Sequence, residues 1–137
     1  MDVAGYSPAI FISGDDTVRF YRRHAVAIFW TLVAVVYAIA IMPSSQAPDL
    51  GAGDKINHIA AFVTLTLLGR GAYRRDPAWR LGVGLSLFGA LIELTQAIPI
   101  LHRDASLWDW AADSAAVIAV LAIIHLIDRR FPARATG

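Results

Sequence analysis

Three apolar stretches of this chain carry pairs of ionisable or amide side chains, and the spacing within each pair is that of neighbours on one helix face. The pairs are three or four residues apart: Lys55 with His58, Glu93 with Gln96, and Asp109 with Asp113. Carboxylates, an ammonium group and an imidazole can together bind an anion, balance a buried charge or transfer a proton. His58 is the natural acid or base among them, because imidazole titrates closest to neutrality.

The composition decides what kind of protein must hold these residues. The chain has 137 residues, of which 57% are hydrophobic and 17% charged, and its mean hydropathy is +0.54. These values exclude a disordered chain and argue against a soluble domain. The 12 Lys and Arg residues against 11 Asp and Glu residues leave a net charge of +1, too little for nucleic-acid binding. The absence of cysteine excludes disulfides, thiolate metal sites and a cysteine nucleophile.

The apolar residues fall into four segments that predict an all-α membrane bundle of four transmembrane helices, one domain covering residues 1–137. Residues 25–42 contain no charge, and 18 helical residues are about 27 Å long, close to the thickness of a bilayer core. We expect this helix to begin earlier, capped by Asp15, Asp16 or Thr17. The other segments cover residues 53–73, 81–100 and 105–127. The second of them has only about 14 uncharged residues and, taken alone, would be read as a core helix.

Two alternatives to this membrane bundle stay open at this point. The first apolar run could belong to a cleaved signal peptide, because Ala38 and Ala40 resemble a cleavage site. However, the 24 residues before the run are longer than a typical signal-peptide start. The other alternative is a soluble helical bundle, which predicts no alternation of charge between successive loops.

The basic residues do alternate in this way. Ten of the twelve Lys and Arg residues lie before the first segment, from the end of the second to the start of the third, or after the fourth, whereas only Lys55 and Arg103 lie on the other side. Since cytoplasmic loops are enriched in Lys and Arg, both termini are predicted to be cytoplasmic. We therefore expect a multi-pass protein of the cytoplasmic (inner) membrane, with residues 1–18 peripheral or mobile.

With this topology, the polar pairs all lie toward the outer side. A carboxylate at the centre of a bilayer costs about 2.5 to 3.5 kcal/mol on insertion scales, so the acids should face the bundle interior. We expect a mixed-charge cluster that opens outward, in which Lys55 and Arg103 balance the acids. Glycines in the third segment should allow close helix contact; they are Gly82, Gly84 and Gly89.

Four strings in this order resemble the VanZ-like family over about residues 40–125: DKINHIAAF at 54–62, ELTQ at 93–96, HRDASLWD at 102–109 and AADSAA at 111–116. The resemblance implies a small integral membrane protein, and the family's namesake is linked to resistance to the glycopeptide teicoplanin. It implies no known reaction. The family's polar positions correspond to Lys55, His58, Glu93, Gln96, Arg103 and Asp109. The chain departs from the pattern where Asp113 replaces an Asn and Ala116 a Gly, and the extra negative charge of Asp113 could change the preferred ligand.

The favoured hypothesis is an outward-facing site that recognises the anionic head group of a lipid or cell-wall precursor, such as a phosphate-bearing lipid carrier. If the protein is an enzyme, the same site would process that head group. Lys55, Arg103 and a protonated His58 would contact phosphate, with Gln96 and Asp113 completing the binding set. In a catalytic version, His58, Glu93 and Asp109 would carry the chemistry. A divalent ion held by Glu93, Asp109 and Asp113 could bridge the phosphate. No cofactor is identified by the sequence.

Two further functions remain as alternatives. One is a structural or accessory membrane subunit, in which the polar cluster only locks helix packing. The other is proton or ion movement along the acids and His58, which the sequence favours least because no acidic residue or histidine continues through the inner half of the second or third segment.

Overall fold

The computed structural model describes residues 14–43, 46, 54–101, 103 and 105–131, which contain four α-helices. Helix α1 comprises Gly14–Ala40, α2 Asp54–Ala72, α3 Ala78–Gln96 and α4 Leu107–Arg130, and a short 3-10 turn, η1, lies at Pro99–Leu101. The predicted all-α class is confirmed. The first helix does begin well before the apolar run. Most of the terminus expected to be peripheral or mobile, residues 1–13, lies outside the described residues.

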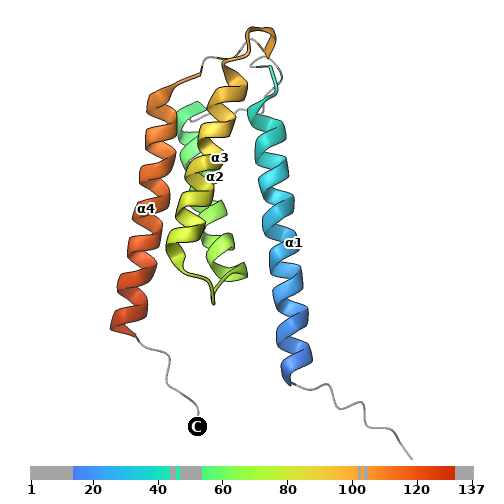
Figure 1. The fold of residues 1–137 in the computed structure, drawn as a ribbon, viewed down its shortest axis with the longest axis vertical. Helices are drawn as coiled ribbons and strands as arrows, with labels where there is room; N and C mark the ends of the chain where they lie inside the picture. Colours follow the sequence, from blue (N-terminus) through green and yellow to red (C-terminus); the bar gives the residue numbers. More distant parts are fainter. Residues whose placement is uncertain (1–13, 44–45, 47–53, 102, 104, 132–137) are drawn as a thin grey trace, which may run out of the picture.

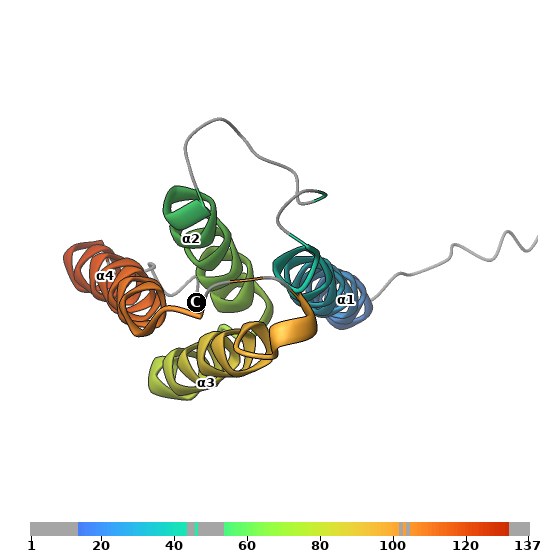
Figure 2. The ribbon, with the colours of Figure 1, turned by 90° about the horizontal axis from the view of Figure 1, so that it is seen from above.

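The helices alternate in direction along the bundle (Figure 1). The end of α1, the start of α2, the end of α3 and the start of α4 lie together at what we call the upper end, at the top of Figure 1. The start of α1, the turn between α2 and α3 and the end of α4 lie at the lower end. Seen from above, α2 packs against the other three helices, whereas α1 and α3 touch little (Figure 2).

Three helices among the described residues are long and apolar enough to cross a membrane: Val18–Ala40 within α1, α3 and α4. Transmembrane helices are thus supported for three of the four predicted spans, and α2 is not one of these three. The large apolar side chains that α3 and α4 leave exposed include Leu87, Leu91, Leu94, Ile123 and Leu126. Apolar faces of this extent would be unfavourable in water and are typical of surfaces that contact lipid.

A small core joins the helices. Its most buried members are Phe62 and Leu65 of α2, Ile92 of α3 and Val117 of α4. Hydroxyl groups also connect neighbouring helices: Ser86 and Ser114 lie with their Oγ atoms 2.9 Å apart, and Tyr37 Oη lies 3.1 Å from Thr95 Oγ1. Interhelical hydrogen bonds of this kind help to hold helices together in a bilayer, where burial against lipid gives little driving force.

The glycines of α3 only partly follow the sequence prediction. A Cβ atom added at Gly89 would lie 3.3 Å from the Phe62 ring, and one at Gly82 would lie 3.2 Å from Leu121, so both permit close contact. The prediction for Gly84 is wrong, because nothing lies within 4 Å of a Cβ atom added there. The tightest position is one that the sequence did not single out: at Gly69 an added Cβ would meet Leu81 at 2.7 Å.

Candidate functional site

The upper end of the bundle brings polar residues from α2 and α4 into contact. The Lys55 ammonium lies 3.2 Å from Asp109 Oδ1, and the two side chains are 56% and 19% exposed. This contact is an ion pair without hydrogen-bond geometry. Asp109 Oδ1 is buried, and it accepts no hydrogen bond from the described residues. Because Lys55 is more than half exposed, we expect this pair to add little to stability, about 0 to 1 kcal/mol. Its lysine remains accessible to an anion.

One helical turn deeper, the same two helices form a second acid–base pair. His58 Nδ1 lies 3.3 Å from Asp113 Oδ2, and the imidazole N–H can donate to the carboxylate there. The side chains are 10% and 2% exposed, so this contact is nearly dry. Asp113 Oδ1 is also buried and accepts no hydrogen bond from the described residues. Removing either partner would leave a buried polar or charged group alone, which is unfavourable.

Glu93 reaches from α3 to the start of α4. Its Oε2 accepts a hydrogen bond of 2.6 Å from the backbone N–H of Ser106, the residue that caps α4 by accepting from Asp109 N through its own hydroxyl. A carboxylate at a helix N-terminus is favoured by the helix dipole and by unpaired N–H groups. Glu93 therefore holds the first turn of α4, and with it Asp109, in place. The catalytic role expected for Glu93 stays a prediction.

Gln96 is directed toward α1. Its Nε2 donates a hydrogen bond of 2.9 Å to the carbonyl oxygen of Ala40, the last residue of α1, and the side chain is buried. Terminal carbonyls of a helix lack intrahelical partners, so this bond satisfies one of them and joins α1 to α3. A structural role is thereby established for Gln96, and its predicted contact with a head group stays a prediction.

A cavity of about 330 Å³ lies beside the buried acid–base pair, within the size range of ligand pockets. Polar residues at the upper end of α2 and in the loop before α4 line part of it: Asn57, His58 and Arg103. Its remaining walls come mainly from apolar side chains of α1 and α2, with one from α3; they include Leu32, Val36, Ile39, Ala61 and Ile92. The cavity is therefore amphipathic, with an apolar length along α1 and α2 and polar groups near the upper end.

Asn57 is a candidate that sequence reasoning did not select. Its Oδ1 is buried and accepts no hydrogen bond from the part of the chain that the structure describes, although it lines the cavity. A buried acceptor without a donor is uncommon and requires water or a ligand group. The sequence feature that could have identified Asn57 is its position directly before His58 on a short apolar helix.

The structure thus collects at one end of the bundle all seven residues that the sequence selected: Lys55, His58, Glu93, Gln96, Arg103, Asp109 and Asp113. Asp109 and Asp113 are each paired with a base. Glu93 and Gln96 are hydrogen-bonded to backbone groups. No three His, Asp or Glu residues of the described ranges are placed to hold a metal ion. The suggested divalent ion on Glu93, Asp109 and Asp113 is therefore not supported.

Comparisons of the chain with protein-family models, with curated proteins and with solved structures gave no match. The VanZ-like resemblance consequently depends on the four quoted strings alone and stays a prediction. The functional argument must be made from the geometry of the upper end.

Proposed function

We propose that this protein spans the cytoplasmic membrane four times and binds the phosphate-bearing head group of an outer-leaflet lipid at the upper end of its bundle. The observation that carries the proposal is the amphipathic cavity of about 330 Å³ between α1 and α2. An amphiphile has the complementary chemistry, since its chain can occupy the apolar length while its head group meets Asn57, His58 and Arg103.

Helix α2 is the proposed fourth span, although it is less apolar than the other three. It lies alongside α3 and has the same length of 19 residues, about 28 Å. Its two central threonines do not leave hydroxyl groups unpaired, because Thr64 donates to Ala60 O at 2.8 Å and Thr66 to Phe62 O at 2.6 Å. Hydroxyls bonded in this way are tolerated in lipid.

The distribution of basic residues supports an outward-facing upper end. Among the helical residues, Arg19, Arg70, Arg80 and Arg129 represent the groups of arginines at the lower end, and Lys55 lies at the upper end. Because Lys and Arg are retained on the cytoplasmic side, we propose that the lower end and both termini face the cytoplasm. The upper site then opens to the outer leaflet.

Binding of phosphate at this site would use charge that is already present. Arg103 offers a planar fork of donors, and Lys55 offers an accessible ammonium group beside Asp109. The buried acceptors Asn57 Oδ1 and Asp113 Oδ1 would take hydrogen bonds from hydroxyl groups or bound water. The site thus offers hydrogen-bond donors to phosphate oxygens and acceptors to hydroxyl groups. An esterified or glycosylated phosphate presents both kinds of group.

A structural role is the competing proposal, and specific contacts favour it. Both acid–base pairs join α2 to α4, Glu93 ties α3 to α4, and Gln96 ties α3 to α1. If these contacts served packing alone, apolar residues of similar volume could replace an ion pair with little change or a gain in stability. This difference allows a direct test.

The test replaces the exposed pair as a unit, in the double variant Lys55→Met with Asp109→Leu. Wild type and variant are placed in phosphatidylcholine nanodiscs, and the affinities for a polyprenyl phosphate and the matching polyprenol are measured. We expect wild type to bind the phosphate roughly tenfold or more tightly than the alcohol, the gain of one charge-assisted hydrogen bond. The double variant should lose this preference and keep its thermal stability.

The matched control is the double variant Ser86→Ala with Ser114→Ala, which removes an uncharged polar contact between α3 and α4. It should bind like wild type. Equal binding of phosphate and alcohol by wild type, or an unchanged preference in the Lys55 and Asp109 variant, would reject head-group binding and favour the structural role. If the VanZ-like resemblance extends to function, expression of wild type but not this variant should also raise resistance to teicoplanin.

A further inference from the structure

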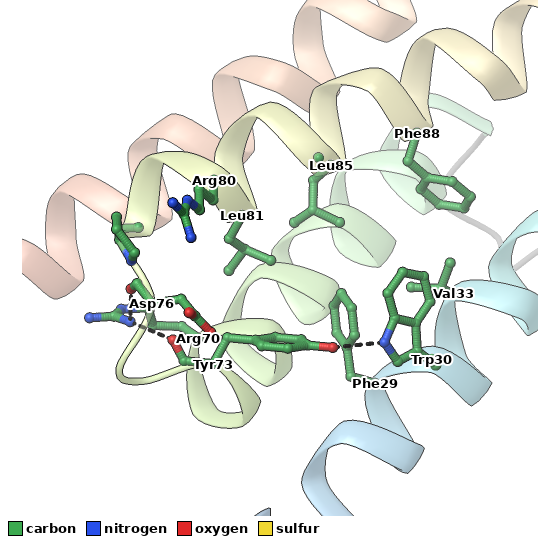
Figure 3. Close-up of a pocket in the computed structure, with 13 residues that line it drawn as sticks. Phe29, Trp30, Val33, Arg70, Tyr73, Asp76, Arg80, Leu81, Leu85 and Phe88 are labelled. Carbon is green, nitrogen blue, oxygen red and sulfur yellow. Dashed lines mark hydrogen bonds between the residues drawn. The ribbon is translucent and has the colours of Figure 1, made fainter.

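A second cavity, of about 380 Å³, lies at the lower end of the bundle (Figure 3). Its walls come from the middle of α1, the end of α2 and the first half of α3, so it shares no residue with the upper cavity. Most of its surface is apolar, and the side chains that face one another across it are Phe29, Val33, Leu81, Leu85 and Phe88.

The polar groups in the aromatic wall of this cavity are bonded to each other. Trp30 Nε1 donates a hydrogen bond of 2.8 Å to Tyr73 Oη, which ties α1 to the turn after α2. The Tyr73 ring also meets the Phe29 ring edge to face, with centroids 5.7 Å apart. Because this bond pairs the indole N–H with the phenol oxygen, it leaves the wall available to an apolar guest.

The rim of the cavity is basic. Arg70 donates from Nη1 to the carbonyl oxygens of Tyr73, Arg74 and Asp76, at 3.0, 3.1 and 3.3 Å, and its guanidinium has further donors. Arg80 of α3 lies on the same rim (Figure 3). Among the described residues that line the cavity, Asp76 is the one acid. The exposed Arg74 and Arg75 lie in the same turn and add positive charge.

The position of the cavity relative to the membrane defines what can reach it. Phe29 and Val33 lie near the middle of the candidate span Val18–Ala40, while Arg80 lies in the first turn of α3, at the lower end. Helices α1 and α3 touch little, and nothing lies within 4 Å of a Cβ atom added at Gly84. An acyl chain could therefore enter between α1 and α3 from the bilayer.

We propose that this cavity holds an acyl chain of an anionic phospholipid of the lower leaflet, with the phosphate beside Arg80 and Arg70. The charge of the rim selects an anionic head group, because each Lys or Arg near the head-group level attracts such lipids. This site is separate from the proposed upper site in its leaflet, its residues and its cavity.

The experiment uses native mass spectrometry of the full-length protein in detergent, with phosphatidylglycerol or phosphatidylcholine of identical chains added. Gly84→Leu places a side chain in the cavity, and Arg80→Gln removes a rim charge. We expect Gly84→Leu to remove one bound molecule of either lipid at concentrations that saturate wild type. Arg80→Gln should weaken phosphatidylglycerol binding roughly fivefold and leave phosphatidylcholine binding unchanged.

The matched control is Gly71→Leu, the same change at a helical glycine that does not line the cavity and has nothing within 4 Å. It should retain lipid like wild type, with helicity and melting temperature confirming the fold of every variant. Equal lipid retention by Gly84→Leu and Gly71→Leu would overturn the proposal. So would a dimer that Gly84→Leu dissociates, because a second copy would then cover the cavity. Loss of phosphatidylglycerol only in the Lys55 and Asp109 double variant would assign the lipid to the upper site and also reject the proposal.

Discussion

His58 and Asp113 form the more buried of the two acid–base pairs, and this burial governs how they respond to substitution. Both pairs join α2 to α4 at similar distances, 3.3 Å for His58 with Asp113 and 3.2 Å for Lys55 with Asp109. The lysine pair is partly hydrated and can be broken at low cost, since water replaces the lost partner. The histidine pair has no such replacement, because Asp113 is only 2% exposed.

We predict that Asp113→Ala will lower the free energy of unfolding by about 1 to 3 kcal/mol, the usual loss when a buried hydrogen-bonding group is left without its partner. Asp113→Asn keeps an oxygen that can accept from the imidazole, and should cost about 1 kcal/mol. Thermal or denaturant unfolding in detergent measures both. The exposed Asp128 supplies the control, since Asp128→Ala should change stability by less than about 0.5 kcal/mol. Equal losses for Ala and Asn at position 113 would contradict the proposed hydrogen bond.

At the level of elements, α2 holds the fold together. It packs against α1, α3 and α4, and it supplies Lys55 and His58 at its upper end and Arg70 at its lower end. Close approach depends on Gly69, where an added Cβ would lie 2.7 Å from Leu81 and 2.8 Å from Phe29. Both neighbours are side-chain atoms, so the Leu81 side chain and the Phe29 ring must shift to make room for an added Cβ.

Gly69→Ala is therefore expected to destabilise the protein by about 1 to 3 kcal/mol, the usual cost of overpacking, despite the better helix propensity of alanine. Gly71→Ala, two residues on in the same helix, meets nothing within 4 Å and should be neutral or stabilising by up to about 1 kcal/mol. Melting temperatures of the two variants give the comparison. The packing argument fails if both substitutions have the same effect.

At the scale of the whole molecule, the proposed topology separates two chemically different ends. The upper end gathers Glu93, Asp109 and Asp113 with Lys55 and Arg103, and the lower end gathers most of the arginines. In a membrane, this asymmetry orients the bundle, because basic residues are retained on the cytoplasmic side. Each cavity then belongs to one leaflet.

Because the chain has no native cysteine, single introduced cysteines can report this orientation. Gln46→Cys lies after α1 at the upper end, whereas Arg75→Cys and Phe131→Cys lie at the lower end, and all three positions are exposed. In intact cells, an impermeant maleimide should label only Gln46→Cys, and permeabilisation should expose the other two. Labelling of Arg75→Cys but not of Gln46→Cys in intact cells would show the opposite orientation. Equal labelling of positions 46 and 75 would exclude α2 as a span.

Much of the fold and the general location of the candidate site could be predicted from the sequence. Apolar run length and helical spacing are local properties, so they predicted the four helices and the pairs Lys55 with His58 and Asp109 with Asp113 on single faces. The antiparallel alternation of successive helices then brought those faces to one end. The charge distribution predicted an orientation that remains to be tested.

Only the tertiary structure decided which partner each polar group meets. Glu93 accepts from Ser106 N and Gln96 donates to Ala40 O, contacts that depend on helix rotation and on the loop path rather than on spacing. The same applies to Gly69, Gly84 and Asn57, whose surroundings come from other helices. Periodicity fixes which residues share a face, but the neighbour across that face is set by packing of distant segments, which no local pattern encodes.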